Sequence, residues 1–171
     1  MICGCSSTPT EGNGHKFFDF HEFFMRDITE LNTSNALLIK RSSIDDNVHF
    51  DTLMEVDWNR ELYAFTEIEI KEVAWQTDFK QVEDEHDVNE HGLVFLTTNE
   101  RQRYREIKFD TTDGGEIYRF AIVMNDDSKL SPSTTMLSYT KGVGYTIKVD
   151  RDTRVLGSES FQIVGQIKSN E

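Results

Sequence analysis

The sequence predicts an α+β domain in which two N-terminal helices pack on a curved, mostly antiparallel sheet, built as a meander of hairpins. Two observations predict this class. Apolar residues recur at helical spacing in two segments that both lie before residue 66. From Arg103 onwards, apolar and polar residues alternate in short runs separated by turn signals, which is typical of antiparallel strands. No second composition regime appears in the 171 residues, so one domain is expected.

The first helix is predicted from Phe20 to Asn32. Asp19 and Glu22 have the spacing of a capping box, and Phe18 and Phe23 are placed to staple the helix entry. The apolar stripe expected to face the core consists of Phe17, Phe20, Phe24, Ile28 and Leu31.

A hairpin and a second helix are expected next. The hairpin turns at Asp46-Asn47, so that Leu37 and Ile39 face Val56 and Met54. The helix is capped by Asp57 and places Trp58, Leu62 and Phe65 on one face. Residues 67–75 are ambiguous between extended chain and an exposed connection, and strands are expected at 78–82 and 92–98.

The C-terminal run of strands begins with the hairpin that is best defined by sequence. A two-residue loop at Asp113-Gly114 pairs Phe109 with Tyr118 and Ile107 with Phe120, which brings the apolar faces together. Three further strands follow up to Lys168, and Pro132 is expected at the start or on the edge of one of them, since proline cannot donate to a sheet. The whole sheet is expected to hold about seven to nine strands.

The charge of the chain excludes one class of partner. There are 18 basic and 31 acidic residues, a net charge of −13. Nucleic-acid binding needs a basic surface, so no nucleic-acid partner is expected, and anionic lipid headgroups are disfavoured for the same reason. No run approaches the ~20 apolar residues of a membrane-spanning helix.

The N-terminus resembles the end of a bacterial lipoprotein signal. Ile2, Gly4 and Cys5 occupy the places of the aliphatic residue, the small residue and the lipid-modified cysteine. Residues 1–16 are therefore interpreted as a truncated signal end and a flexible tether, and residues 17–171 as the single domain. Cys5 would carry the lipid anchor. Two locations stay open: the cell envelope if an upstream signal is restored, as an outer-membrane or periplasmic lipoprotein, and the cytoplasm otherwise.

Several short motifs across the chain resemble those of small, uncharacterised envelope lipoproteins of Bacteroidetes. These motifs are Phe18-Asp19-Phe20, the run 57–62 with Phe65, Ala74-Trp75, and the run 142–147. The resemblance implies an envelope-anchored α+β domain, and none of its motifs is catalytic.

The sequence contains no motif of a known catalytic mechanism, so a non-enzymatic protein without a cofactor is expected. One acidic and histidine-rich run, residues 83–91, has two interpretations. It is either a solvated charged loop or a weak metal site in which His86, His91 and Asp87 are the candidate ligands.

Two functions are compatible with these observations. The first is a membrane-tethered interaction or structural module that contacts other envelope components, and the sequence favours it because aromatic residues at core-facing positions normally belong to the core. The second is a carrier or chaperone of an apolar ligand, suggested by the 11% aromatic content. A cavity of several hundred Å³ between sheet and helices would favour the carrier.

Overall fold

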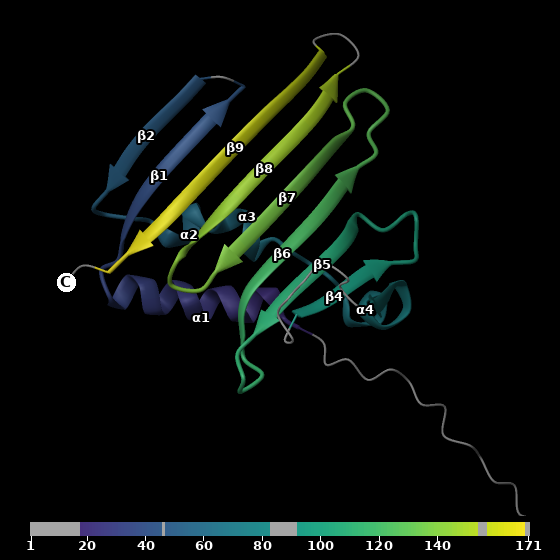
Figure 1. Cartoon of the computed structure of the whole chain (residues 1–171), viewed down its shortest axis with the longest axis horizontal. Helices are drawn as coiled ribbons and strands as arrows, with labels where there is room; N and C mark the ends of the chain where they lie inside the picture. The colour runs from purple at the N-terminus through teal and green to yellow at the C-terminus, as the bar shows by residue number, and fades with distance from the viewer. Residues whose placement is uncertain (1–17, 46, 83–91, 154–156, 170–171) are drawn as a thin grey trace, which may run out of the picture.

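The computed structural model describes residues 18–45, 47–82, 92–153 and 157–169. They form one sheet of nine strands with helices on one of its faces (Figure 1). The helices are α1 (Phe20–Thr33), α2 (Trp58–Glu61), α3 (Tyr63–Thr66) and α4 (Glu72–Asp78). The strands are β1 (Leu37–Ile44), β2 (Asn47–Leu53), β3 (Phe79–Val82), β4 (Gly92–Thr97), β5 (Tyr104–Thr111), β6 (Ile117–Asp126), β7 (Ser133–Thr140), β8 (Gly144–Thr153) and β9 (Gly157–Lys168).

The spatial order of the strands is β2-β1-β9-β8-β7-β6-β5-β4-β3, and every neighbouring pair is antiparallel. The strands from β3 to β9 form a meander, in which each pairs with the next along the chain. The hairpin β1–β2 joins the last strand, β9, so the first two strands of the chain lie beside the last one (Figure 1). The predicted antiparallel sheet is confirmed.

The predicted helical layer is wrong. Instead of two N-terminal helices packed on the sheet, the described residues form four helices, and three of these have seven residues or fewer. The expected second helix is interrupted at Leu62, where the Phe65 N–H bonds to the Leu62 carbonyl three residues back. Apolar spacing predicts which side chains are buried, but it does not predict whether the α-helical hydrogen bonds continue. The fold is therefore mainly one large sheet with small helices.

Helix α1 follows its prediction closely. The Glu22 N–H donates to Asp19 Oδ1 at 2.9 Å, so Asp19 caps the helix. The rings of Phe18 and Phe23 lie 5.5 Å apart, as expected for a hydrophobic staple.

Both predicted hairpin registers are wrong by two residues. In β5–β6, Phe109 pairs with Phe120, because the turn is longer than two residues: the Gly115 N–H bonds to the Thr112 carbonyl, and the Thr112 N–H bonds to the carbonyl of Glu116. A shift of two residues keeps the same side chains on the core face.

In the other hairpin, β1–β2, the turn lies one residue earlier than predicted, and Ile44 pairs with Asn47. Leu38 pairs with Leu53 and is fully buried, so the expected core face of β1, Leu37 and Ile39, is also wrong. Because residues 36–39 are all apolar, their pattern does not predict which of them face the core.

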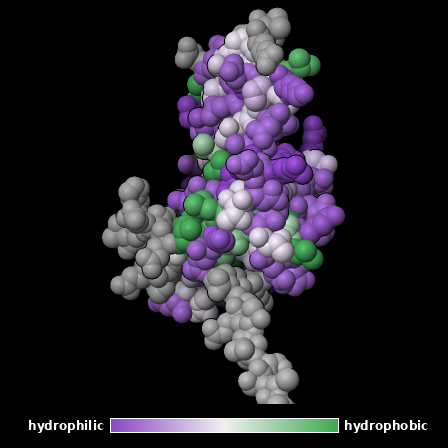
Figure 2. All heavy atoms as spheres, turned by 90° about the vertical axis from the view of Figure 1, so that its right-hand side faces the viewer, coloured by the Kyte–Doolittle hydropathy of each residue, from purple (hydrophilic) through white to green (hydrophobic). Residues whose placement is uncertain are grey.

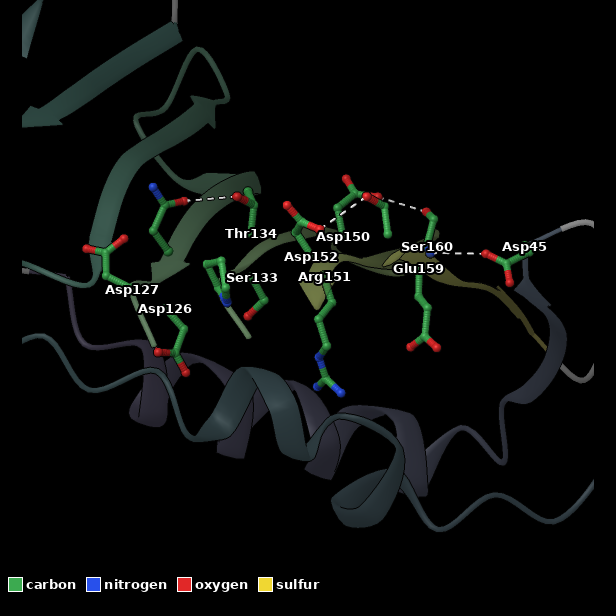
Figure 3. Close-up of a pocket in the computed structure, with 13 residues that line it drawn as sticks. Asp45, Asp126, Asp127, Ser133, Thr134, Asp150, Arg151, Asp152, Glu159 and Ser160 are labelled. Carbon is green, nitrogen blue, oxygen red and sulfur yellow. Dashed lines mark hydrogen bonds between the residues drawn. The ribbon is translucent and has the colours of Figure 1, made fainter. Parts of the chain in front are cut away.

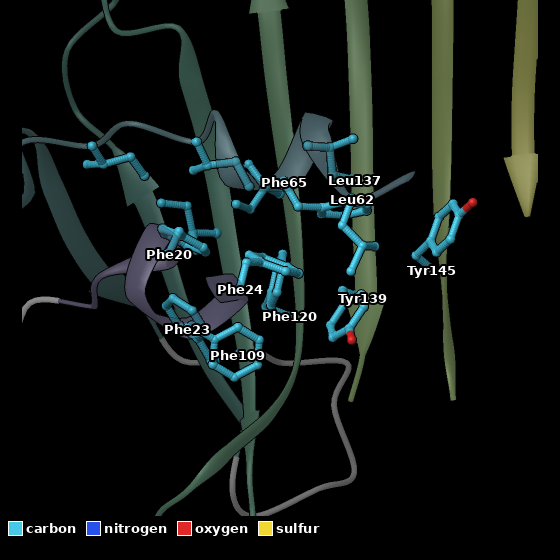
Figure 4. Close-up of a cluster of buried hydrophobic side chains, with 14 of the residues drawn as sticks. Phe20, Phe23, Phe24, Leu62, Phe65, Phe109, Phe120, Leu137, Tyr139 and Tyr145 are labelled. Carbon is cyan, nitrogen blue, oxygen red and sulfur yellow. The ribbon is translucent and has the colours of Figure 1, made fainter. Parts of the chain in front are cut away.

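The core lies between α1, α2–α3 and the middle of the sheet, and it is rich in aromatic rings (Figure 4). Phe24 of α1 is at its centre, with ring centroids 5.3 Å from Phe65, 5.4 Å from Phe120 and 5.0 Å from Tyr139. Most of these contacts are edge-to-face, the arrangement that aromatic pairs prefer. This packing holds α1 firmly against β6 and β7.

Candidate functional site

A large hollow lined by aromatic side chains lies beside the N-terminal half of α1. Its volume is about 680 Å³, and it lies between α1, α4, β4 and the β5–β6 hairpin. We call it the aromatic cleft. Its apolar lining consists of Phe18, Phe23, Trp75, Leu93, Phe95, Phe109, Ile117 and Tyr118.

The floor of the aromatic cleft is a continuous layer of rings. Trp75 of α4 lies 4.8 Å from Phe95 of β4 and 6.1 Å from Phe109 of β5, measured between ring centroids. Phe109 in turn lies 5.0 Å from Phe18, which precedes α1. Each of these rings comes from a different segment, and the alternation of β4 and β5 turns Phe95 and Phe109 to the helix-covered face.

One end of the aromatic cleft is charged. Arg26 and Glu30 of α1 and Lys141 of the β7–β8 turn line this end, and Lys141 Nζ lies 2.9 Å from Glu30 Oε2. Thr111, Thr112 and Glu116 also line the cleft where β5 turns into β6, so the cleft is apolar over β4 and the middle of β5 and polar toward the β5–β6 and β7–β8 turns. Such a gradient suits a molecule with an apolar body and one polar end.

A buried carboxylate lies next to this charged end. Asp27 is 2% exposed, and it accepts a hydrogen bond from the hydroxyl of Tyr139. Burial, together with the charge of Glu30, raises the pKa of Asp27 from 3.8 to about 6, although Lys141 and Arg26 act in the opposite direction. Asp27 is not among the candidate site residues predicted from the sequence. Its position on the buried stripe of α1, between Phe24 and Ile28, is the signal that could have revealed it.

A second polar cluster joins α2 to the sheet. The hydroxyl of Tyr145 donates to Glu61, and Lys40 Nζ lies 2.6 Å from the same carboxylate. Burial, and then the hydrogen bond to Glu61, raise the pKa of Tyr145, which keeps this hydroxyl protonated as a donor. The arrangement is a structural clamp between helix and sheet.

The far end of the sheet carries an acidic hollow of about 420 Å³ (Figure 3). Its carboxylates belong to Asp45, Asp126, Asp127, Asp150, Asp152 and Glu159. Asp150 is already engaged by Lys148 Nζ at 2.7 Å and by the hydroxyl of Ser160 at 2.8 Å, and these hydrogen bonds lower its pKa. Among the described residues, no three His, Cys, Asp or Glu side chains are grouped as a metal would require.

The structure does not test the site residues suggested by the sequence. Cys5 and the candidate metal ligands His86, Asp87 and His91 lie outside the described residues. The aromatic cleft was not predicted residue by residue, because its walls come from positions 18 to 141, far apart along the chain.

Comparisons with protein-family models, with curated proteins and with solved structures found no match. The resemblance to envelope lipoproteins stays a prediction. No helix in the part of the chain that the structure describes is long and apolar enough to cross a bilayer.

Proposed function

We propose that this protein is a non-enzymatic carrier that binds a small apolar ligand in the aromatic cleft. The observation that carries the proposal is the cleft itself, whose volume of about 680 Å³ falls in the usual range of ligand pockets. A carrier requires a cavity of this size, whereas the tethered interaction module, which the sequence alone favours, requires none.

The lining supports the same conclusion. Six aromatic rings and two aliphatic side chains border the space, and the polar side chains lie toward the β5–β6 and β7–β8 turns and on α1. The central core needs no such space, because Phe24, Phe65, Phe120 and Tyr139 fill it with mutual ring contacts. Figure 2 shows a mainly hydrophilic surface on the side of the molecule where α4 and β4 lie, with hydrophobic residues gathered in patches. An apolar ligand would enter from a polar surface into an apolar interior.

The test is a binding titration with N-phenyl-1-naphthylamine, an uncharged apolar fluorophore. We expect saturable binding at one site per chain, with energy transfer from Trp75, which lines the cleft. The variant Leu93→Trp fills the cleft and should abolish binding. The matched control is Val73→Trp, which adds the same ring to α4 at a side chain that is 72% exposed. Absence of saturable binding by the wild-type protein, or equal binding by both variants, would overturn the proposal.

We also propose that the carrier is anchored in the cell envelope through a lipid on Cys5. The support is the pattern of Ile2, Gly4 and Cys5 followed by a Ser/Thr-rich tether. Intact mass spectrometry of the protein extracted from its own cells should show a chain that begins at Cys5 and bears acyl groups. An unmodified chain beginning at Met1 would contradict the anchor without affecting the carrier proposal.

A further inference from the structure

Strand β2 is an open edge of the sheet. It is the outermost strand, and on its outer side no described strand pairs with it (Figure 1). Natural proteins blunt such edges with proline, lysine, a bulge or a very short strand. β2 has seven residues without Pro or Lys, and its pairing with β1 runs without a register shift from Leu53 to Asn47. The opposite edge strand, β3, has only four residues. β2 is thus the edge that can accept another strand.

The side chains of β2 differ between its two faces. Val48, Phe50 and Thr52 lie on one face, and the exposed fractions of Val48 and Phe50 are 41% and 70%. His49 and Asp51 lie on the other face, and both are exposed. An exposed phenylalanine at the centre of a sheet edge is a large apolar group that a neighbouring strand would cover.

The register of the hairpin also determines which backbone groups are free. Ile44 and Asn47 flank a two-residue connection, and such flanking residues hydrogen-bond to each other. Bonded and non-bonded pairs alternate along antiparallel strands, so Asn47, His49 and Asp51 direct their backbone groups toward β1. Val48 and Phe50 therefore direct their N–H and C=O groups outward, to the open edge.

We propose that β2 pairs antiparallel with β2 of a second copy of this chain, about a two-fold axis that passes beside Phe50. In a contact about a two-fold axis, a residue i that faces residue j of the second copy implies that residue j also faces residue i of the second copy. Phe50 then lies opposite Phe50 of the second copy, and Val48 lies opposite Thr52. His49 lies opposite Asp51 twice, once on each side of the axis. This reciprocal imidazole–carboxylate pairing is the charge complementarity that selects a second copy as the partner.

Neighbouring registers lack this complementarity. The two-fold symmetry and the outward backbone groups allow only shifts that keep each side chain on its face. One such shift places Asp51 opposite Asp51, and like charges directly opposite each other destabilise a strand pair. The other places His49 opposite His49. The register centred on Phe50 joins the two nine-stranded sheets into one continuous sheet with both charge pairs satisfied.

The test is sedimentation-velocity ultracentrifugation of the full chain over a range of concentrations up to millimolar. We expect a reversible dimer. His49→Asp creates two like-charge pairs and should weaken the dimer by at least about tenfold. The double variant His49→Asp with Asp51→His restores opposite charges in the same register and should restore the dimer. Gln81→Asp, an exposed change on β3, is the matched control and should leave the dimer unchanged.

A second variant tests the strand itself. Phe50→Lys places two lysines opposite each other on the axis, and it should yield a monomer whose circular dichroism and thermal unfolding match those of the wild type, since Phe50 is largely exposed. A wild-type monomer at every concentration would overturn the proposal. So would a dimer that survives Phe50→Lys, or a loss in His49→Asp that the double variant fails to restore.

Discussion

The hydroxyl of Tyr139 on β7 donates a hydrogen bond to the buried carboxylate of Asp27 on α1, which ties the longest helix to the middle strand of the sheet. The two residues share the same aromatic environment, because the ring of Tyr139 also packs against Phe24 and Phe120 (Figure 4). The bond therefore combines with the ring contacts to hold α1 in one position.

Tyr139→Phe should destabilise the fold by about 1–3 kcal/mol, because it removes a donor from a buried carboxylate while keeping the ring. The free energy of unfolding in urea measures the change. Tyr118→Phe removes a hydroxyl from a side chain that is 37% exposed, and it should change stability by less than about 0.5 kcal/mol. Equal effects of the two substitutions would show that the hydrogen bond to Asp27 contributes nothing.

The raised pKa of Asp27 predicts a pH dependence with a definite sign. The folded protein holds the proton of Asp27 up to about pH 6, whereas the ordinary value is 3.8, so protonation favours the folded state. This contribution is complete below pH 3.8 and is lost as the pH rises through 6. The free energy of unfolding of the wild type relative to Asp27→Asn should fall by up to about 3 kcal/mol over this interval. Parallel pH profiles of the two proteins would contradict the prediction.

Local signals in the sequence predicted the elements whose structure depends on neighbouring residues. Asp19 caps α1, as its position before the helix predicts. β7 begins immediately after Pro132, so the missing N–H of proline does not interrupt the hydrogen bonds between strands. Registers and helix continuity depend on more distant contacts. The spacing of apolar residues does not show that the helix breaks at Leu62, or that Gly115, with its positive φ, belongs to a turn longer than two residues.

The lining of the aromatic cleft could also be predicted only in part from the sequence. Phe95 and Phe109 could be assigned to strands from alternation, but their approach to Trp75 depends on the order of β4 and β5 and on the position of α4. The segment that contains α4 was ambiguous by sequence, so one wall of the cleft was unpredictable. Asp27 is different, because a single acidic residue within an apolar stripe is visible in the sequence and indicates a buried partner.

Asp19→Ala should destabilise the protein by about 1 kcal/mol, because Asp19 caps the only long helix among the described residues. Asp19→Asn is the control. Its side-chain oxygen can still accept from the Glu22 N–H, and it should retain most of the stability. Chemical denaturation of the wild type and of the two variants measures the free energy of unfolding. An equal loss in both variants would show that the charge of Asp19, and not its capping hydrogen bond, stabilises the helix.

Gly165→Ala should also destabilise the fold. A Cβ at this position of β9 would lie 2.2 Å from Cε1 of Tyr145, the residue that pairs with Gly165 across β8–β9. The Tyr145 ring is buried and its hydroxyl is bonded to Glu61, so the ring has little room to move. We expect a loss of about 1–3 kcal/mol in the free energy of unfolding.

Two further variants separate a clash at Gly165 from a general cost of alanine. Gly114→Ala meets its nearest atom at 3.6 Å and should change stability by less than about 0.5 kcal/mol. In a double-mutant cycle, Tyr145→Leu removes the ring that the new methyl group would meet. The double variant should then lose less free energy of unfolding than the sum of the losses in the two single variants, because residues in contact are energetically coupled. Strict additivity would show that the Tyr145 ring is not what requires glycine at position 165.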